Sequence, residues 1–397
     1  MRLRYVLMNA YASGGTVRTT LGMAGALAER GHDVEVASVL QSRPEPPFPV
    51  SGALRLRSLT GTRPVPLTSA WRHPVSAGLW ATARALRGTS RVVVPEDLRH
   101  GAFSLVSDAA LVSYLRSQHD AVVVGTRAGL NLAVARYAAG DAVAVAQEHM
   151  NLTRAGDALR AHYRERYPRL DAVVTLTETD AVAYRELLGP DARVLTVPNA
   201  VPAGLPSPSR SDDGRVVVAA GRITPQKGFD ILVKAWRTVA AAEPGWQLQI
   251  HGSGTHEAQL RALVTELGLQ DSVRLMGFTP DLPSVLAAAD LYVLSSRFEG
   301  FPMVLLEAMA CGLPVVAFDC PTGPGEVIDH GRNGLLVKPK SIAGLARALQ
   351  RAIGDPALRR SMGAAAAVTA QSYTREAVAD RWEQLFGDLL RGRGLPT

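Results

Sequence analysis

The fold is decided by the stretch Ser295-Ser-Arg-Phe-Glu-Gly-Phe-Pro-Met-Val-Leu-Leu-Glu-Ala-Met-Ala-Cys-Gly312. Pro302 suits the first position of a helix, and Gly312 suits its C-terminal cap. The residues between them are apolar nearly all round, which predicts a buried helix. Glu307 lies inside this apolar run. Because an ionised carboxylate is costly to bury without a partner or a polar ligand, a functional role is favoured for Glu307.

A second carboxylate, Glu299, lies eight positions before Glu307, in the loop that leads into the same helix. We expect both carboxylates to face one cleft. The backbone amides from Gly300 to Met303 are expected to point at the same place, because the N-terminus of a helix offers free N–H donors.

Short apolar runs alternate with helical segments along the whole chain, which predicts parallel sheets covered by helices on both faces. The fold expected is α/β with two doubly wound, Rossmann-like sheets facing each other across a cleft. Strands are expected in the first half at 4–8, 33–39, 121–124, 142–146 and 172–176, and in the second half at 216–220, 246–251, 273–276, 291–294 and 314–318.

Residues 197–214 are dense in Pro, Ser and Gly and lack periodicity, which predicts an exposed interdomain linker. We therefore expect one domain over 1–204 and a second domain over 205–397. Helical spacing near the end predicts a helix over about 374–392 that can pack back on the first domain. Helices are also expected at 79–87 and 105–115.

Composition bounds the class of protein. The chain has 397 residues, 47% of them hydrophobic and 20% charged, which supports packed cores. Residues 1–200 hold 23 Arg, no Lys and 17 acidic residues, so most of the net charge of +7 lies there. Scattered arginines with few aromatics disfavour nucleic acid, whereas an anionic membrane surface or an acidic partner fits. The base composition of the genome explains the presence of most of the arginines as well.

Neither a disulfide framework nor a cysteine zinc site is expected, because Cys311 and Cys320 are the only cysteines. No apolar run approaches the ~18 residues that span a bilayer. The expected protein is cytoplasmic, with a peripheral position on the inner face of the membrane as the alternative.

Several glycine-rich turns follow predicted strands, where open parallel sheets bind ligands. Gly14 and Gly15 can let the backbone approach an anion closely. Gly221 precedes Arg222 and Lys227, two cations spaced to surround one phosphate group. The turn at 251–256 does not complete a dinucleotide fingerprint, so a hydride-transfer enzyme is disfavoured.

These residues resemble the retaining GT-B glycosyltransferases of family 4. The resemblance rests in the second half on 221–222, 227–228, the turn 252–254, 277–278, the pair Glu299 and Glu307, and 324–326. In the first half it rests more loosely on 14–15, 148–149 and 198–199.

The resemblance implies a nucleotide-diphosphate sugar on the second domain, with UDP favoured and GDP possible. Arg222 and Lys227 would bind the diphosphate and stabilise the leaving group without a metal, a reading that the lack of an Asp-x-Asp pair supports. Glu307 would hold the ribose, and His149 would contact the transferred sugar from the first domain. Transfer would retain the anomeric configuration without an enzyme nucleophile or a cofactor. The remaining implied positions are the sugar site at Glu299, Gly300, Phe301, Pro302 and Met303, the base site at Phe278, and the turns at Gly14, Gly15, Gly221 and Gly252.

Other functions stay open at this point. An epimerase is disfavoured by the paired carboxylates and cations, and a phosphorylase by the lack of a sign of a pyridoxal phosphate site. A non-catalytic, nucleotide-sugar-binding regulatory subunit remains an alternative. The acceptor is expected to be a lipid-linked or polymeric envelope glycan resembling teichoic acid or capsule, with a natural product or other small molecule as the alternative.

Overall fold

The computed structural model describes residues 1–60, 88–209 and 214–396. Contacts divide the chain into two compact units: unit 1 is Met1–Pro198 with Val378–Thr397, and unit 2 is Asn199–Ala377. The chain thus passes into unit 2 a few residues before the boundary expected near 205. The helix expected at 79–87 lies outside the described residues.

Unit 1 contains a parallel sheet of seven strands in the order β3-β2-β1-β4-β5-β6-β7. Every pair of neighbouring strands is parallel, so all carboxyl ends meet at one edge. This edge is where a doubly wound sheet binds ligands. The strands are β1 Arg2–Leu7, β2 Asp33–Ser38, β3 Arg55–Ser58, β4 Val122–Gly125, β5 Val143–Gln147, β6 Ala172–Thr175 and β7 Val194–Thr196.

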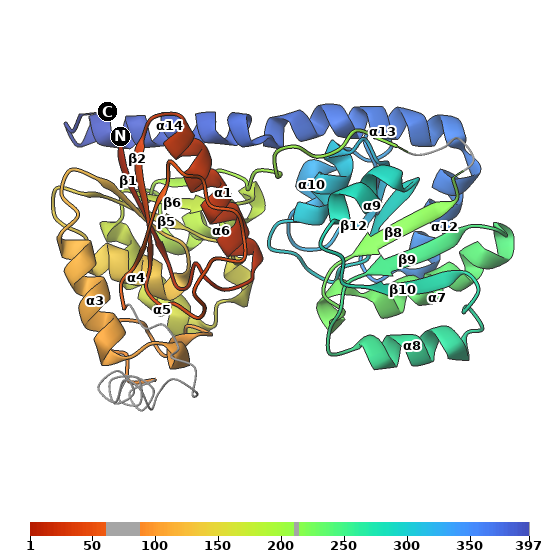
Figure 1. Ribbon diagram of the computed structural model, residues 1–397, viewed down its shortest axis with the longest axis horizontal. Coiled ribbons are helices and arrows are strands. Elements are labelled where there is room, and N and C mark those ends of the chain that lie inside the picture. The colour runs from red at the N-terminus through yellow and green to blue at the C-terminus, as the bar shows by residue number, and fades with distance from the viewer. Residues whose placement is uncertain (61–87, 210–213, 397) are drawn as a thin grey trace. The chain divides into compact units, whose positions relative to one another are not determined.

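The helices of unit 1 cover this sheet (Figure 1). They are α1 Gly15–Glu29, α3 Leu105–Arg116, α4 Ala128–Tyr137, α5 Asp157–Arg166, α6 Glu178–Leu188 and most of α14 Arg375–Gly392. Ion pairs bind α14 to the rest of the unit: Arg30 at the end of α1 contacts Asp380 at 2.6 Å and Glu383 at 2.8 Å. At its C-terminal end Arg393 contacts Asp171 at 2.6 Å. The last helix therefore closes unit 1.

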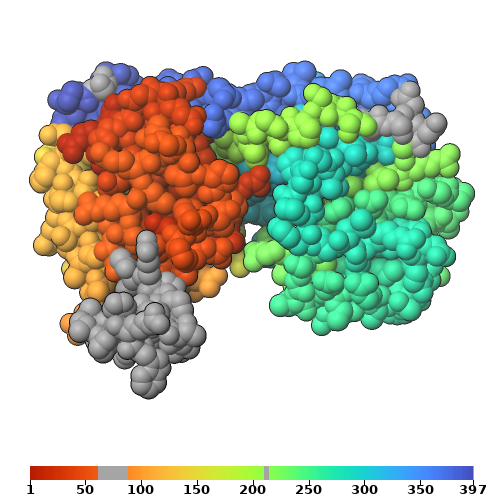
Figure 2. All heavy atoms as spheres, in the orientation of Figure 1, coloured from red at the N-terminus to blue at the C-terminus, as the bar shows by residue number. Residues whose placement is uncertain are grey.

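Unit 2 contains a second parallel sheet, of six strands in the order β10-β9-β8-β11-β12-β13. Its strands are β8 Val216–Ala220, β9 Gln247–His251, β10 Val273–Gly277, β11 Leu291–Leu294, β12 Val315–Phe318 and β13 Leu335–Val337. Its helices are α7 Phe229–Ala242, α8 Glu257–Glu266, α9 Leu282–Ala288, α10 Met303–Ala310, α11 Pro324–Val327, α12 Ile342–Gly354 and α13 Pro356–Ala370. On the face seen in Figure 2, α8 lies at the outer surface of the unit.

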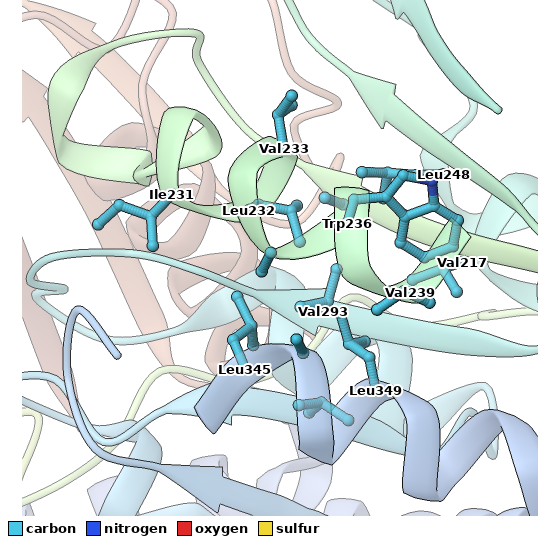
Figure 3. Packing of buried hydrophobic residues seen from close by; sticks show 14 of the residues in the cluster. Val217, Ile231, Leu232, Val233, Trp236, Val239, Leu248, Val293, Leu345 and Leu349 are labelled. Atoms are coloured by element: carbon cyan, nitrogen blue, oxygen red, sulfur yellow. The ribbon is translucent and has the colours of Figure 1, made fainter. Parts of the chain in front are cut away.

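The core of unit 2 shows why this sheet forms. Trp236 of α7 is fully buried and packs toward Val217 and Leu248 on the sheet, and Leu345 and Leu349 of α12 close the cluster from the neighbouring helix (Figure 3). Burying an apolar side chain of this size contributes about 1.5–3 kcal/mol. The apolar stripes of α7 and α12 therefore fix both helices on one face of the sheet.

The two doubly wound sheets expected from the sequence are confirmed, but three strands were missed. These are β3, β7 and β13, which have four, three and three residues and all lie at sheet edges. Each has at most four residues, which is too short to show the periodic apolar pattern by which strands are predicted.

The helix α1 begins at Gly15, so this glycine belongs to the first turn of the helix. One further expectation needs correction. The predicted linker is not wholly exposed, because Val201 is buried and its amide donates to the carbonyl of Tyr373 at 2.8 Å. Residues 199–209 thus belong to unit 2. Cys311 and Cys320 are both buried, as core residues are.

Candidate functional site

In unit 2, the loops after β8 and β9 pack backbone to backbone. A Cβ on Gly252, which has a φ of +140°, would lie 1.9 Å from the carbonyl oxygen of Gly221. A Cβ on Gly254 would lie 2.3 Å from the oxygen of Ile223, and the Ile223 amide donates to the carbonyl of Ser253 at 2.9 Å. Only glycine fits at these contacts, which join the two loops at the carboxyl edge of the sheet.

Lys227 crosses the same edge. It ends the 3-10 turn Pro225–Lys227, and its side chain passes over Gly221, where a Cβ would lie 2.8 Å from Lys227 Cε. Its Nζ donates to Glu299 Oε1 at 2.7 Å, and the two side chains are 18% and 7% exposed. The structure therefore joins a cation and a carboxylate that are 72 residues apart in sequence.

The loop after β11 is clamped to the loop after β8. Arg297 donates to both carboxylate oxygens of Asp230, at 2.9 and 2.8 Å, and also to the carbonyl of Pro225. Ser296 donates to the Oε1 of Glu299 that Lys227 also contacts. These bonds hold Glu299 and Lys227 in one fixed arrangement. The sequence analysis assigned no role to Arg297 or Asp230.

Glu307 lies on α10 and is 1% exposed. Burial raises the pKa of the Tyr292 hydroxyl, and the negative charges of Glu299 and Glu307 raise it further. Both carboxylates therefore lie close enough to act on Tyr292 of β11.

The N-terminus of α10 differs in detail from the expectation. Pro302 is the N-cap and the helix begins at Met303, whose amide donates to the carbonyl of Phe301 at 2.9 Å. That tight turn uses one of the amides expected to face a ligand. Among the described residues, the amides of Gly300 and Phe301 have no backbone acceptor. The predicted donor set is thus reduced to these two.

Two other predicted residues of unit 2 lie at the surface. Arg222 follows β8 and is exposed, and its carbonyl accepts the amide of Thr224 at 2.8 Å. Phe278 follows β10 and is 77% exposed. The carbonyl of Gly277 before it accepts the amide of Gly252 at 2.7 Å, which ties the end of β10 to the loop after β9.

In unit 1, a cavity of about 570 Å³ lies at the carboxyl ends of β1, β4 and β5. Gly14 and Gly15 line it, and a Cβ on either would meet nothing within 4 Å. Gly14 is the N-cap of α1 and has an extended φ of 167°, which any residue adopts. The two glycines therefore leave space above the helix N-terminus, but the backbone itself does not require them.

Glu148 and His149 follow β5 and both line this cavity. Glu148 is buried, and its Oε1 accepts Nδ2 of Asn131 at 2.8 Å and the hydroxyl of Tyr167. Burial raises the pKa of Glu148 to about 7, although both hydrogen bonds favour the ionised form. Burial also lowers the pKa of His149 to about 4, so this imidazole is neutral at neutral pH.

Arg127 and Asp97 form the most closely bonded ion pair of the cavity wall. Arg127 Nε donates to Asp97 Oδ2 at 3.0 Å, and its Nη2 donates to Oδ1. Neither this pair nor Asn131 was predicted from the sequence. A signal was present for Arg127, since it lies two residues after the end of β4, just as the predicted donor residue Arg222 lies two residues after the end of β8. Asp97 lies in an irregular segment and carries no comparable signal.

Among the described residues, no group of three or more His, Cys, Asp or Glu side chains is arranged to hold a metal ion. In the same part of the chain, no helix has both the length and the apolar character needed to cross a membrane.

Two family models match the chain. The model described as glycosyl transferases group 1 matches residues 206–369, and the model described as glycosyltransferase family 4 matches residues 13–204. Together they cover both units apart from the ends and residue 205.

Relatives over the full chain agree with these matches. The exopolysaccharide phosphotransferase SCO2592 of Streptomyces coelicolor is 36% identical over 100% of this chain, which spans 42% of the length of that protein. An uncharacterized glycosyltransferase of Haemophilus influenzae is 27% identical over 97% of this chain and 99% of its own length.

A solved structure supports the fold. TarM of S. aureus, as a mutant in complex with fondaparinux, alpha-GlcNAc-glycerol and UDP, has a TM-score of 0.74 at 14% identity, covering 97% of this chain and 99% of its own. Likeness at this identity concerns the architecture alone. From the matched models and this architecture, the chain belongs to the family 4 glycosyltransferases, whose C-terminal part is the glycosyl transferases group 1 domain, and it has the GT-B fold.

Proposed function

We propose that this protein transfers a sugar from a nucleotide-diphosphate sugar, bound by unit 2, to a hydroxyl of an acceptor bound by unit 1. The observation that carries the proposal is the cluster at the carboxyl edge of the unit 2 sheet. There Lys227 contacts Glu299 at 2.7 Å, and Glu307 is buried in an otherwise apolar helix. A cation beside two carboxylates suits a ligand that carries both a diphosphate and hydroxyl groups.

Each residue then has a defined part in binding the donor. Glu307 accepts hydrogen bonds from the ribose hydroxyls, and Glu299 with the amides of Gly300 and Phe301 holds the sugar hydroxyls. Lys227 and the exposed Arg222 contact the diphosphate. The backbone near Phe278 borders the base.

Transfer breaks the bond between the anomeric carbon and the diphosphate oxygen and forms a bond from the acceptor oxygen to the same carbon. The acceptor proton passes to the departing phosphate. The acceptor attacks the face of the sugar from which the phosphate leaves, and attack on this face retains the anomeric configuration. Lys227 and Arg222 stabilise the charge that develops on the leaving group, which needs no metal ion. His149, neutral at physiological pH, borders the acceptor in the unit 1 cavity.

UDP is the favoured nucleotide because the similar TarM structure was solved with UDP. An envelope glycan is the favoured acceptor because the Streptomyces relative is named for exopolysaccharide. Both are proposals for this chain, with GDP-sugars and small-molecule acceptors as the alternatives. A protein that binds the donor without turnover is the other alternative.

The test is calorimetric binding of UDP, GDP, ADP and CMP with their common sugar conjugates, followed by an acceptor screen with the selected sugar. We expect one nucleotide to bind selectively and Glu307→Gln to weaken binding about tenfold or more, since a charged hydrogen bond contributes about 1.5–3 kcal/mol. Unchanged affinity in Glu307→Gln removes its assigned role. Turnover should persist in EDTA, and loss of turnover that a divalent ion restores contradicts the metal-free reaction.

A further inference from the structure

The carboxylate of Asp97 in unit 1 has all of its hydrogen-bond acceptor positions occupied. Its side chain is fully buried, and each oxygen accepts two bonds. Oδ2 accepts Arg127 Nε at 3.0 Å and the amide of Gly129 at 2.9 Å. Oδ1 accepts Arg127 Nη2 and the amide of Arg99 at 2.8 Å. With four donors fixed around it, Asp97 has no capacity left for a ligand, and its effect is to hold the Arg127 guanidinium in one orientation.

The orientation leaves a second edge of the guanidinium available. A guanidinium is planar and has five N–H donors, and Asp97 occupies the edge formed by Nε and Nη2. The other edge, formed by Nη1 and Nη2, points away from Asp97. The Sδ of Met8 lies 3.4 Å from Nη1, and a thioether is a weak acceptor. Arg127 lines the cavity of about 570 Å³ and its side chain is 22% exposed.

The other charges of the cavity wall do not make it uniformly positive. Arg99 and Arg154 line it, as do Glu96, Asp157 and Glu148. Glu96 lies 3.5 Å from His162, and Glu148 is largely neutral below its raised pKa of about 7. Selection of an anion therefore depends on the fixed pair of N–H groups of Arg127 rather than on the overall potential of the cavity.

We infer that the unit 1 cavity binds an acceptor that carries an oxyanion, a phosphate ester or a carboxylate, and that Arg127 is the residue that recognises it. The free edge of Arg127 donates two parallel hydrogen bonds to two oxygens of the anion. Asp97 is the positioning residue that fixes this edge. The inference rests on the proposed function only in calling the ligand the acceptor.

The experiment measures probe binding by calorimetry without nucleotide, using glycerol 1-phosphate, glucuronate and the neutral methyl glucoside. The wild type should bind at least one anionic probe more tightly than methyl glucoside. Binding of glycerol 1-phosphate indicates a phosphate ester as the anion recognised, and binding of glucuronate indicates a carboxylate.

Three variants complete the design. Arg127→Lys keeps the charge but loses the two-pronged edge, and we expect it to bind about 10- to 100-fold more weakly. The double variant Asp97→Asn with Arg127→Gln removes the ion pair without leaving a buried charge unpaired. It therefore tests the site even if a single substitution in the pair prevents folding. Arg136→Gln is the matched control, since Arg136 is an exposed arginine on α4, the helix that follows Arg127, and lies outside the cavity wall.

The inference is overturned if the wild type binds neither anionic probe, if the neutral probe binds as well as the anionic ones, or if Arg127→Lys and the double variant bind like the control. Donor binding to the same proteins separates the two proposals. Arg127-dependent anion binding without any nucleotide-sugar binding sinks the proposed function and leaves the anion site standing. Normal nucleotide-sugar binding without anion binding overturns the anion site and leaves the proposed function standing.

Discussion

Replacing Glu148 by glutamine should stabilise unit 1 above pH 7 and change its stability little near pH 4.5. Glutamine keeps the size of the side chain and an oxygen that can accept the bonds from Asn131 and Tyr167. It removes only the ability to ionise. The cost of carrying a charge in this buried position therefore appears in the wild type and not in the variant.

The magnitude follows from the pKa of Glu148, which burial raises from 4.5 to about 7, with the charges of Asp180 and Asp97 adding to the effect. Since one pKa unit corresponds to about 1.4 kcal/mol, the difference is roughly 3 kcal/mol. A raised pKa in the folded state gives stability that is fully present below pH 4.5 and lost as the pH rises to about 7. The variant should thus gain roughly 3 kcal/mol relative to the wild type over this window.

The assay is urea unfolding at pH 4.5, 6 and 8, read by a brief deuterium pulse on peptides from β5 so that unit 1 is followed separately. His149 has a lowered pKa and contributes in the opposite direction, but it is present in both proteins and cancels in the difference. Glu186→Gln, at an exposed glutamate of α6, is the control and should show no such trend. A difference between Glu148→Gln and wild type that stays constant from pH 4.5 to 8 refutes the reasoning.

Two further predictions concern unit 2. Lys227→Ala should lower turnover about 10²- to 10³-fold, because a donor to the developing anion is lost, and should destabilise the unit by about 1–3 kcal/mol because Glu299 loses its partner. Steady-state rates and urea unfolding are compared with those of the control Lys234→Ala, which replaces an exposed lysine on α7. Wild-type rates in Lys227→Ala would remove Lys227 from the diphosphate site. Gly252→Ala should destabilise unit 2 by more than about 2 kcal/mol, since its Cβ would lie 1.9 Å from the Gly221 oxygen at a φ of +140°, and a wild-type melting temperature would contradict that contact.

Much of the unit 2 site could be predicted because its signals are local. The spacing of Glu299 and Glu307 and the apolar helix around Glu307 are visible within eighteen residues, and α10 forms there with a buried Glu307. The N-terminus was predicted less well. Whether the amide of Met303 faces a ligand or bonds to Phe301 depends on a turn of a few dihedral angles, which residue types alone do not specify.

Composition and periodicity by themselves were enough for two parallel sheets and for their interior strands, because burial on both faces demands continuous apolar runs. The edge strands β3, β7 and β13, the pairing of Lys227 with Glu299 and the hydrogen bonds between Arg127 and Asp97 were seen only in the folded chain. The same holds for the pKa of Glu148, which depends on burial and on groups that come from other elements. Periodicity reports what one segment buries, whereas a charge pair or a shifted pKa depends on which distant groups the fold brings within a few ångströms of one another.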